Sequence, residues 1–179
     1  ENYYSFWKDY ETKKFDEVCK KYLSVNGKLY LDAKETNAKF DEITVIPSDA
    51  VGSKGDEAML RGMLNLFNGK KIRMLTPRRE LWKGWLIDRN EDYTEQYVEL
   101  EELKNTIKKP THLVIIGADI MDGLYGSRDT MTRLEAAERV IDLGGRVDIF
   151  SCSFRMEVSE DIIRKIINIG ERLHFHFRD

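Results

Sequence analysis

The strongest constraint on the fold is a regular alternation of short apolar runs and longer amphipathic segments from residue 42 onward. The apolar runs predict strands at 43–46, 72–75, 113–116 and 147–150, and an alternating pattern predicts a last strand at 173–177. Between them, apolar residues at helical spacing predict helices over 56–67, 134–141 and 162–167. Strands that alternate with helices predict parallel pairing through right-handed crossovers. We therefore expect an α/β, Rossmann-like three-layer sandwich with a mostly parallel sheet.

Two stretches do not follow this alternation. Residues 78–108 are irregular, and we expect helical structure around 81–86 and 97–107. Residues 1–41 form an N-terminal helical or extension segment that precedes the domain at 42–179. In this segment the apolar residues Phe6, Tyr10, Phe15, Val18, Cys19 and Tyr22 stand among many charges. They predict an amphipathic helix, or a pair of helices, that ends before a possible short strand at 28–31.

The composition bounds the class of protein. Of 179 residues, 41% are hydrophobic and 34% are charged, which suits one folded domain with a well-solvated surface. The net charge of −3 and the pI of about 5.8 lack the basic bias of a nucleic-acid-binding protein. The two cysteines, Cys19 and Cys152, stand in apolar contexts that indicate buried thiols in a reducing, cytoplasmic compartment. We expect no transmembrane segment and no signal peptide, although a sequence that begins at Glu1 leaves a removed leader open.

Ligands of open parallel sheets bind beyond the carboxyl ends of the strands. Three loops that follow expected strands, at 48–56, 117–128 and 151–157, are rich in Gly, Ser and Asp. In the first, Gly55, Asp56 and Glu57 open a helix, where glycine lets the backbone approach a ligand. The loop has neither the dinucleotide-binding nor the P-loop spacing. The alternative is that Asp56 and Glu57 simply stabilise the helix dipole.

In the second loop, Asp119 and Asp122 stand three residues apart after the most apolar strand, with Tyr125 close behind. Such a pair of carboxylates can orient sugar hydroxyls, act as acid and base, or help to hold a cation. The alternative is that Asp119 caps a turn and that Asp122 and the following glycine form a tight turn. We favour a binding role over a turn and expect no dedicated metal site.

The third loop places hydroxyls at Ser151 and Ser153, which would point to the same side of an extended chain. A serine nucleophile is not indicated, because the G-x-S-x-G elbow is missing. His174 and His176 share one face of the last strand. We interpret them as histidines with hydrogen-bond partners rather than as metal ligands, since no third ligand is evident.

Taken together, these loops resemble the polysaccharide pyruvyl transferase family. The resemblance rests on Gly55-Asp56-Glu57-Ala58, the stretch from Gly117 to Tyr125, Gly144-Gly145, Ser151-Cys152-Ser153 and Arg178-Asp179. These motifs occur in the family's order and cover about residues 42–179.

The resemblance implies the N-terminal half of a two-Rossmann, glycosyltransferase-type fold. It implies transfer of a pyruvyl group from phosphoenolpyruvate to sugar hydroxyls in cell-surface polysaccharide synthesis, without a cofactor. In the family, the residues that hold phosphoenolpyruvate lie in the C-terminal half. This chain would therefore contribute the acceptor side and would be inactive alone. The cleft-lining candidates are Gly55, Asp56, Glu57, Asp119, Asp122, Tyr125, Ser151 and Ser153.

Two other functions remain open at the level of sequence. The chain could be a non-catalytic Rossmann-like binding or assembly module, and its aromatic start, Tyr3, Tyr4, Phe6, Trp7 and Tyr10, could pack in a homodimer. It could also be half of a sugar-nucleotide glycosyltransferase.

Overall fold

The computed structural model describes residues 40–67, 69–79, 81–82, 93–118, 120–123, 126–154 and 158–177. The expected N-terminal helix, the possible strand at 28–31 and Cys19 lie outside these described residues. Cys152 lies within them and is buried, as the sequence predicts.

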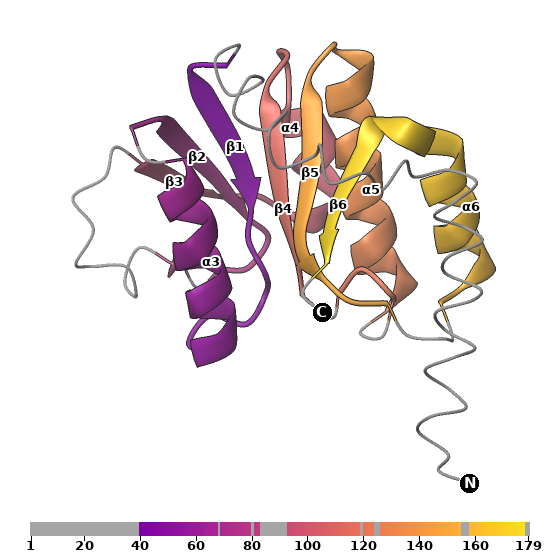
Figure 1. The fold of residues 1–179 in the computed structure, drawn as a ribbon, viewed down its shortest axis with the longest axis horizontal. Helices are drawn as coiled ribbons and strands as arrows, with labels where there is room; N and C mark the ends of the chain where they lie inside the picture. Colours follow the sequence, from indigo (N-terminus) through magenta and orange to yellow (C-terminus); the bar gives the residue numbers. More distant parts are fainter. Residues whose placement is uncertain are drawn as a thin grey trace, which may run out of the picture.

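Six parallel strands form one sheet in the order β3-β2-β1-β4-β5-β6 (Figure 1). They are β1 (Glu42–Ile46), β2 (Lys71–Thr76), β3 (Tyr93–Tyr97), β4 (His112–Ala118), β5 (Arg146–Cys152) and β6 (Leu173–Phe177). The predicted α/β, Rossmann-like sandwich is confirmed, and so are all five strands that the sequence predicts.

The strand β3 corrects the expectation for residues 78–108. The sequence indicated irregular structure with a helix from residue 97, but residues 93–97 pair in parallel with β2 at the edge of the sheet. Its sequence Tyr-Thr-Glu-Gln-Tyr is polar, and its residues alternate between half-buried and exposed, as suits an edge strand. Helical structure in the described part of this stretch comprises η2 (Leu100–Glu102) and α4 (Leu103–Thr106).

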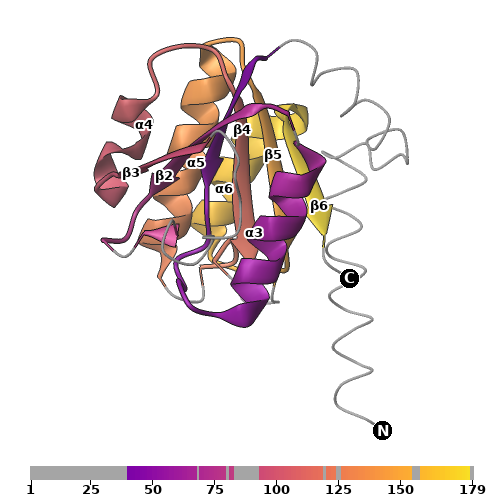
Figure 2. The same cartoon turned by 90° about the vertical axis from the view of Figure 1, so that its left-hand side faces the viewer.

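Helices cover the sheet on both faces. On one face, α3 (Lys54–Leu66) packs on apolar residues of β1, β2 and β4. On the other, α4, α5 (Ser127–Asp142) and α6 (Glu160–Ile169) pack with β4, β5 and β6. Figure 2 shows α3 on one side of the sheet and α4 and α5 on the other. Among the helices of the described part, none is long and apolar enough to cross a bilayer.

A buried charge cluster lies on the α3 side of β5. Asp148, which is 1% exposed, accepts hydrogen bonds from His112 Nε2 at 2.6 Å and His176 Nε2 at 2.7 Å. Arg146 adds two more bonds, from Nε at 2.6 Å and Nη2 at 3.1 Å. Burial alone would raise the pKa of Asp148, but these donors outweigh it and hold the pKa far below its usual range. Burial also lowers the pKa of the neighbouring His174 below its ordinary value.

Both shifts predict that acid destabilises the fold. His174 is held neutral in the folded chain but takes up a proton in the unfolded chain below its unfolded pKa of about 6.5. Stability is therefore lost as the pH falls below that value. The pKa of Asp148 is depressed by folding, so its contribution is present above an unfolded pKa of about 4 and is lost progressively below it. We expect the free energy of unfolding, measured by urea denaturation, to fall from pH 8 to 5 and more steeply below pH 4.

A matched pair of variants isolates the cluster. Asp148→Asn should flatten the steep limb below pH 4, whereas Asp142→Asn, at an exposed position of α5, should leave the profile unchanged. Equal pH profiles for the two variants would contradict this assignment.

Candidate functional site

The order of the strands creates a topological switch point between β1 and β4. These strands are neighbours, but the chain leaves β1 toward β2 on one side and leaves β4 toward β5 on the other. The two loops that follow them therefore diverge, and in open α/β sheets such a point is where ligands bind. All three candidate loops leave this same edge, because they follow the carboxyl ends of the parallel strands β1, β4 and β5.

The first loop is organised as a helix start. Ser53 caps α3 by accepting a hydrogen bond from the backbone N–H of Asp56 at 3.4 Å. Glu57 pairs with Arg61 at 2.9 Å and with Lys54 at 3.2 Å, and these hydrogen bonds, chiefly that of Arg61, lower its pKa. The side chain of Glu57 is therefore paired within α3, as the helix-stabilising alternative expects. Gly55 is exposed, and a Cβ there would meet Ser53 Oγ at 3.9 Å, so packing does not demand this glycine.

The second loop folds back through consecutive turns. The N–H of Ile120 donates to the carbonyl of Gly117 at 3.0 Å, and the N–H of Gly123 donates to that of Ile120 at 3.2 Å. Gly123 has φ 80°, which favours glycine. The tight turn of Asp122 and Gly123 is therefore present, and Asp122 within it is 4% exposed. Asp119 and Tyr125 lie outside the described residues.

The third loop holds the one non-glycine residue of the described chain with positive φ. Ser151, near the end of β5, has φ 54°. A side chain in this left-handed region is strained, and such strain is concentrated at functional sites. The register with β6 also shifts between Phe150 and Cys152. The prediction that Ser151 and Ser153 point to the same side assumed that side chains alternate regularly along an extended strand. The positive φ and the register shift interrupt that alternation.

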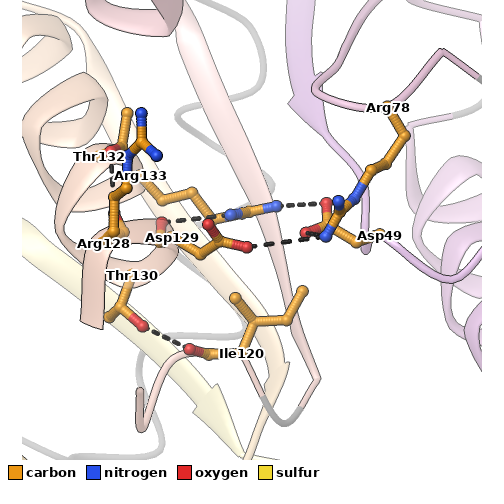
Figure 3. A network of polar contacts seen from close by, with 8 residues as sticks. All are labelled: Asp49, Arg78, Ile120, Arg128, Asp129, Thr130, Thr132 and Arg133. Atoms are coloured by element: carbon orange, nitrogen blue, oxygen red, sulfur yellow. Dashed lines mark hydrogen bonds and ion pairs between the residues drawn. The ribbon is translucent and has the colours of Figure 1, made fainter. Parts of the chain in front are cut away.

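A network of charges that no sequence motif indicated spans the switch point (Figure 3). Arg133 of α5 is fully buried and donates from Nη2 to Oδ1 of Asp49, in the loop after β1, at 2.5 Å. Arg78, in the loop after β2, lies 3.2 Å from Oδ2 of Asp49 and 3.8 Å from Oδ2 of Asp129. Desolvation lowers the pKa of Arg133, and the nearby Asp49 and Asp129 oppose this shift. The network joins three segments that are far apart in the sequence.

Two polar atoms beside this network are buried without a hydrogen-bond partner among the described residues. They are Nε of Arg133 and Oγ of Ser48, which precedes Asp49. Buried polar groups are almost always satisfied, and exceptions cluster at functional sites. The sequence signal for Arg133 was its place on the apolar stripe of α5, beside Leu134 and Ala137.

Within the described residues, no group of histidines, cysteines and carboxylates is arranged to hold a metal ion. His176 has a hydrogen-bond partner, as predicted, and that partner is Asp148. Comparison of the chain with protein-family models, with curated proteins and with solved structures found no match.

The buried arginine predicts a large loss of stability on truncation. Arg133→Ala leaves the largely buried carboxylate of Asp49 without its closest partner, which should cost about 3–5 kcal/mol in urea denaturation. Arg128→Ala, also on α5, removes an exposed pair with Glu101 of η2 and should cost at most about 1 kcal/mol. Similar costs for both variants would show that the buried pair does not hold these segments together.

The conformation of Ser151 predicts opposite effects of two neighbouring glycine substitutions. Ser151→Gly relieves a left-handed backbone and should stabilise the fold by about 1 kcal/mol. Ser153→Gly relieves no such conformation and should destabilise by about 0.5–1 kcal/mol through chain entropy. Thermal unfolding of both variants checks the signs, and destabilisation by Ser151→Gly would argue against strain.

Proposed function

We propose that residues 42–179 form the acceptor-binding half of a pyruvyl transferase, similar to the polysaccharide pyruvyl transferases. In this proposal, phosphoenolpyruvate is the donor and a saccharide is the acceptor. The donor is held by residues outside this chain.

One observation carries the proposal. The three loops that resemble the family's motifs leave one edge of a doubly wound sheet, and two of them flank its switch point. That edge also carries the strained Ser151 and the buried polar atoms of Ser48 and Arg133. Backbone strain and buried polar groups both cost stability. Their presence at this edge supports a binding role for the edge.

The charges at the edge favour a neutral ligand over a multiply charged one. Arg78 and Arg133 face Asp49 and Asp129, and Glu57 is paired with Lys54 and Arg61. Anions such as phosphate are held by arginine, lysine and helix N-termini whose charge is available. These cations are already matched by carboxylates, so this edge suits the hydroxyls of a sugar better than phosphoenolpyruvate.

The chemistry of a pyruvyl ketal sets what the acceptor must present. The oxygens of two hydroxyls of one sugar bond to the central carbon of the pyruvyl group. One hydroxyl proton ends on the methylene carbon, which becomes a methyl group, and the other leaves with the displaced phosphate. The acceptor must therefore offer two hydroxyls close together, and one of them needs a base or a strong acceptor for its proton. Asp122, in the loop after β4, and Ser151, near the end of the neighbouring strand β5, are the described candidates for orienting such a pair.

Calorimetric titration tests the proposal. The chain should bind methyl glycosides or oligosaccharides with adjacent free hydroxyls and should not bind phosphoenolpyruvate. Asp122→Asn should weaken saccharide binding by ~1–3 kcal/mol, because it removes a charged acceptor from a buried position. Asp142→Asn is the control, since α5 begins at this edge of the sheet and ends at the opposite one.

Thermal unfolding must first show that both variants are folded. Tight phosphoenolpyruvate binding by this chain would place the donor here and contradict the proposal. Equal saccharide affinity in the two variants would remove Asp122 from the site.

A further inference from the structure

Five aromatic rings follow one another across the α3 side of the sheet, and we call them the aromatic row. In spatial order they are Phe40, His112, Phe67, Phe150 and His176. Successive ring centroids lie 6.3, 5.2, 6.4 and 4.2 Å apart, and the last two rings are stacked with an interplanar angle of 5°. Contacts of this kind stabilise beyond the apolar area that they bury.

The row runs from the part of the sheet under α3 to the part formed by β5 and β6. Phe67, at the C-cap of α3, meets Phe150 of β5 edge-on. Beyond it, Asp148 and Phe150 pair in register with His174 and His176 of β6, so the four residues share this face. The described helices that follow β4 and β5 pack on the opposite face.

The outer end of the row is accessible. Phe150 and His174 are half-buried, and the side chain of His176 retains 19% of its exposure. The sheet is parallel throughout, and parallel sheets are normally covered on both faces. The surface over β5 and β6 therefore fits a covering element with aromatic and aliphatic side chains.

The chain enters the described region at the other end of this row. Phe40 is the first described residue, it is 9% exposed, and its ring is 6.3 Å from that of His112. Its carbonyl accepts a hydrogen bond from Lys70 Nζ at 3.0 Å. The preceding 39 residues are thus tethered directly beside the aromatic row.

The sequence before Phe40 contains a segment that matches this surface. Its residues Phe15, Val18, Cys19 and Tyr22 stand at the spacing of one helical face, with Lys14, Asp16, Glu17 and Lys20 between and beside them. The 17 residues 23–39 can span up to roughly 55 Å when extended. The strands β4 and β6 are two steps apart, or about 10 Å. The tether is therefore long enough to place the segment over β5 and β6.

We propose that residues 15–22 dock as an amphipathic helix on the outer aromatic row, through Phe15, Val18, Cys19 and Tyr22. The occupant of this face is the chain's own N-terminal segment rather than a second copy or another protein. The inference is independent of the proposed transferase function, because it uses neither the switch point nor its loops.

Cysteine cross-linking in the full chain tests this arrangement, because Cys19 supplies one native thiol. His174→Cys places a second thiol on the face over β6, and Arg164→Cys places one on the exposed side of α6, across the sheet. A short bis-maleimide should link Cys19 within one monomer in the His174→Cys protein at least roughly tenfold faster than in the Arg164→Cys protein. The unsubstituted chain, with the buried Cys152, gives the background.

Two further substitutions in the His174→Cys protein test the stripe itself. Val18→Asp should lower the linking rate to that of the Arg164→Cys protein, whereas Lys20→Asp, away from the stripe, should not change it. Equal rates for the two thiol positions, or no effect of Val18→Asp, would overturn the proposal. Links between copies in place of links within one copy would assign the face to a dimer and would also overturn it.

Hydrogen exchange of the unsubstituted chain gives an answer even if His174→Cys fails to fold. The amides of residues 15–22 should be protected, and Val18→Asp should abolish that protection while Lys20→Asp retains it. Exchange of these amides at the rate of an unfolded peptide would contradict docking.

Discussion

The pairing of β4 with β1 determines how the other elements are arranged. Ile43 lies beside His112 and Ile46 beside Ile115 in this pair, and all four side chains are buried. Because β2 occupies the other side of β1, the second half of the chain must grow away from the first. Right-handed crossovers then place α3 on one face and α5 on the other. The edge where the motif loops lie is thus a consequence of this one contact.

At that edge the chain keeps a buried ion pair where an apolar contact would serve stability equally well. The pairing of Arg133 with Asp49 removes an arginine completely from water, and the desolvation penalty of such a pair can match its Coulombic gain. What the pair does provide is position, because one guanidinium holds both Asp49, after β1, and the carbonyl of Asp129, in the first turn of α5. Arg78 connects the loop after β2 to the network, because it pairs with the carboxylates of Asp49 and Asp129. The relative placement of the loops is therefore fixed by directional bonds.

The sequence predicted the interior of the fold better than its edges. Apolar runs such as 113–116 indicate central strands directly, because a strand that is buried on both faces needs apolar side chains at every position. The strand β3 has no apolar run that would indicate it. Its side chains are half-buried or exposed, because it lies at the edge of the sheet and pairs with β2. At the site, the strand-end rule located the loops, but the partners of Arg133 depend on contacts between residues 84 positions apart. The strain at Ser151 is a backbone property that its hydroxyl chemistry did not indicate.

The electrostatic balance at the edge has a consequence for the proposed transfer. To hold phosphoenolpyruvate with the arginines of this edge, Arg78 or Arg133 would have to leave the largely buried carboxylate of Asp49, and breaking such a pair is destabilising. In the proposed transfer, the cations for the donor therefore come from a second surface. A division of acceptor and donor between two surfaces also serves the chemistry, because water is excluded from the reacting phosphate ester only when the two surfaces close. In the proposed transfer, an acceptor edge whose arginines are already paired would close against a cationic donor surface without burying unpaired cations of its own.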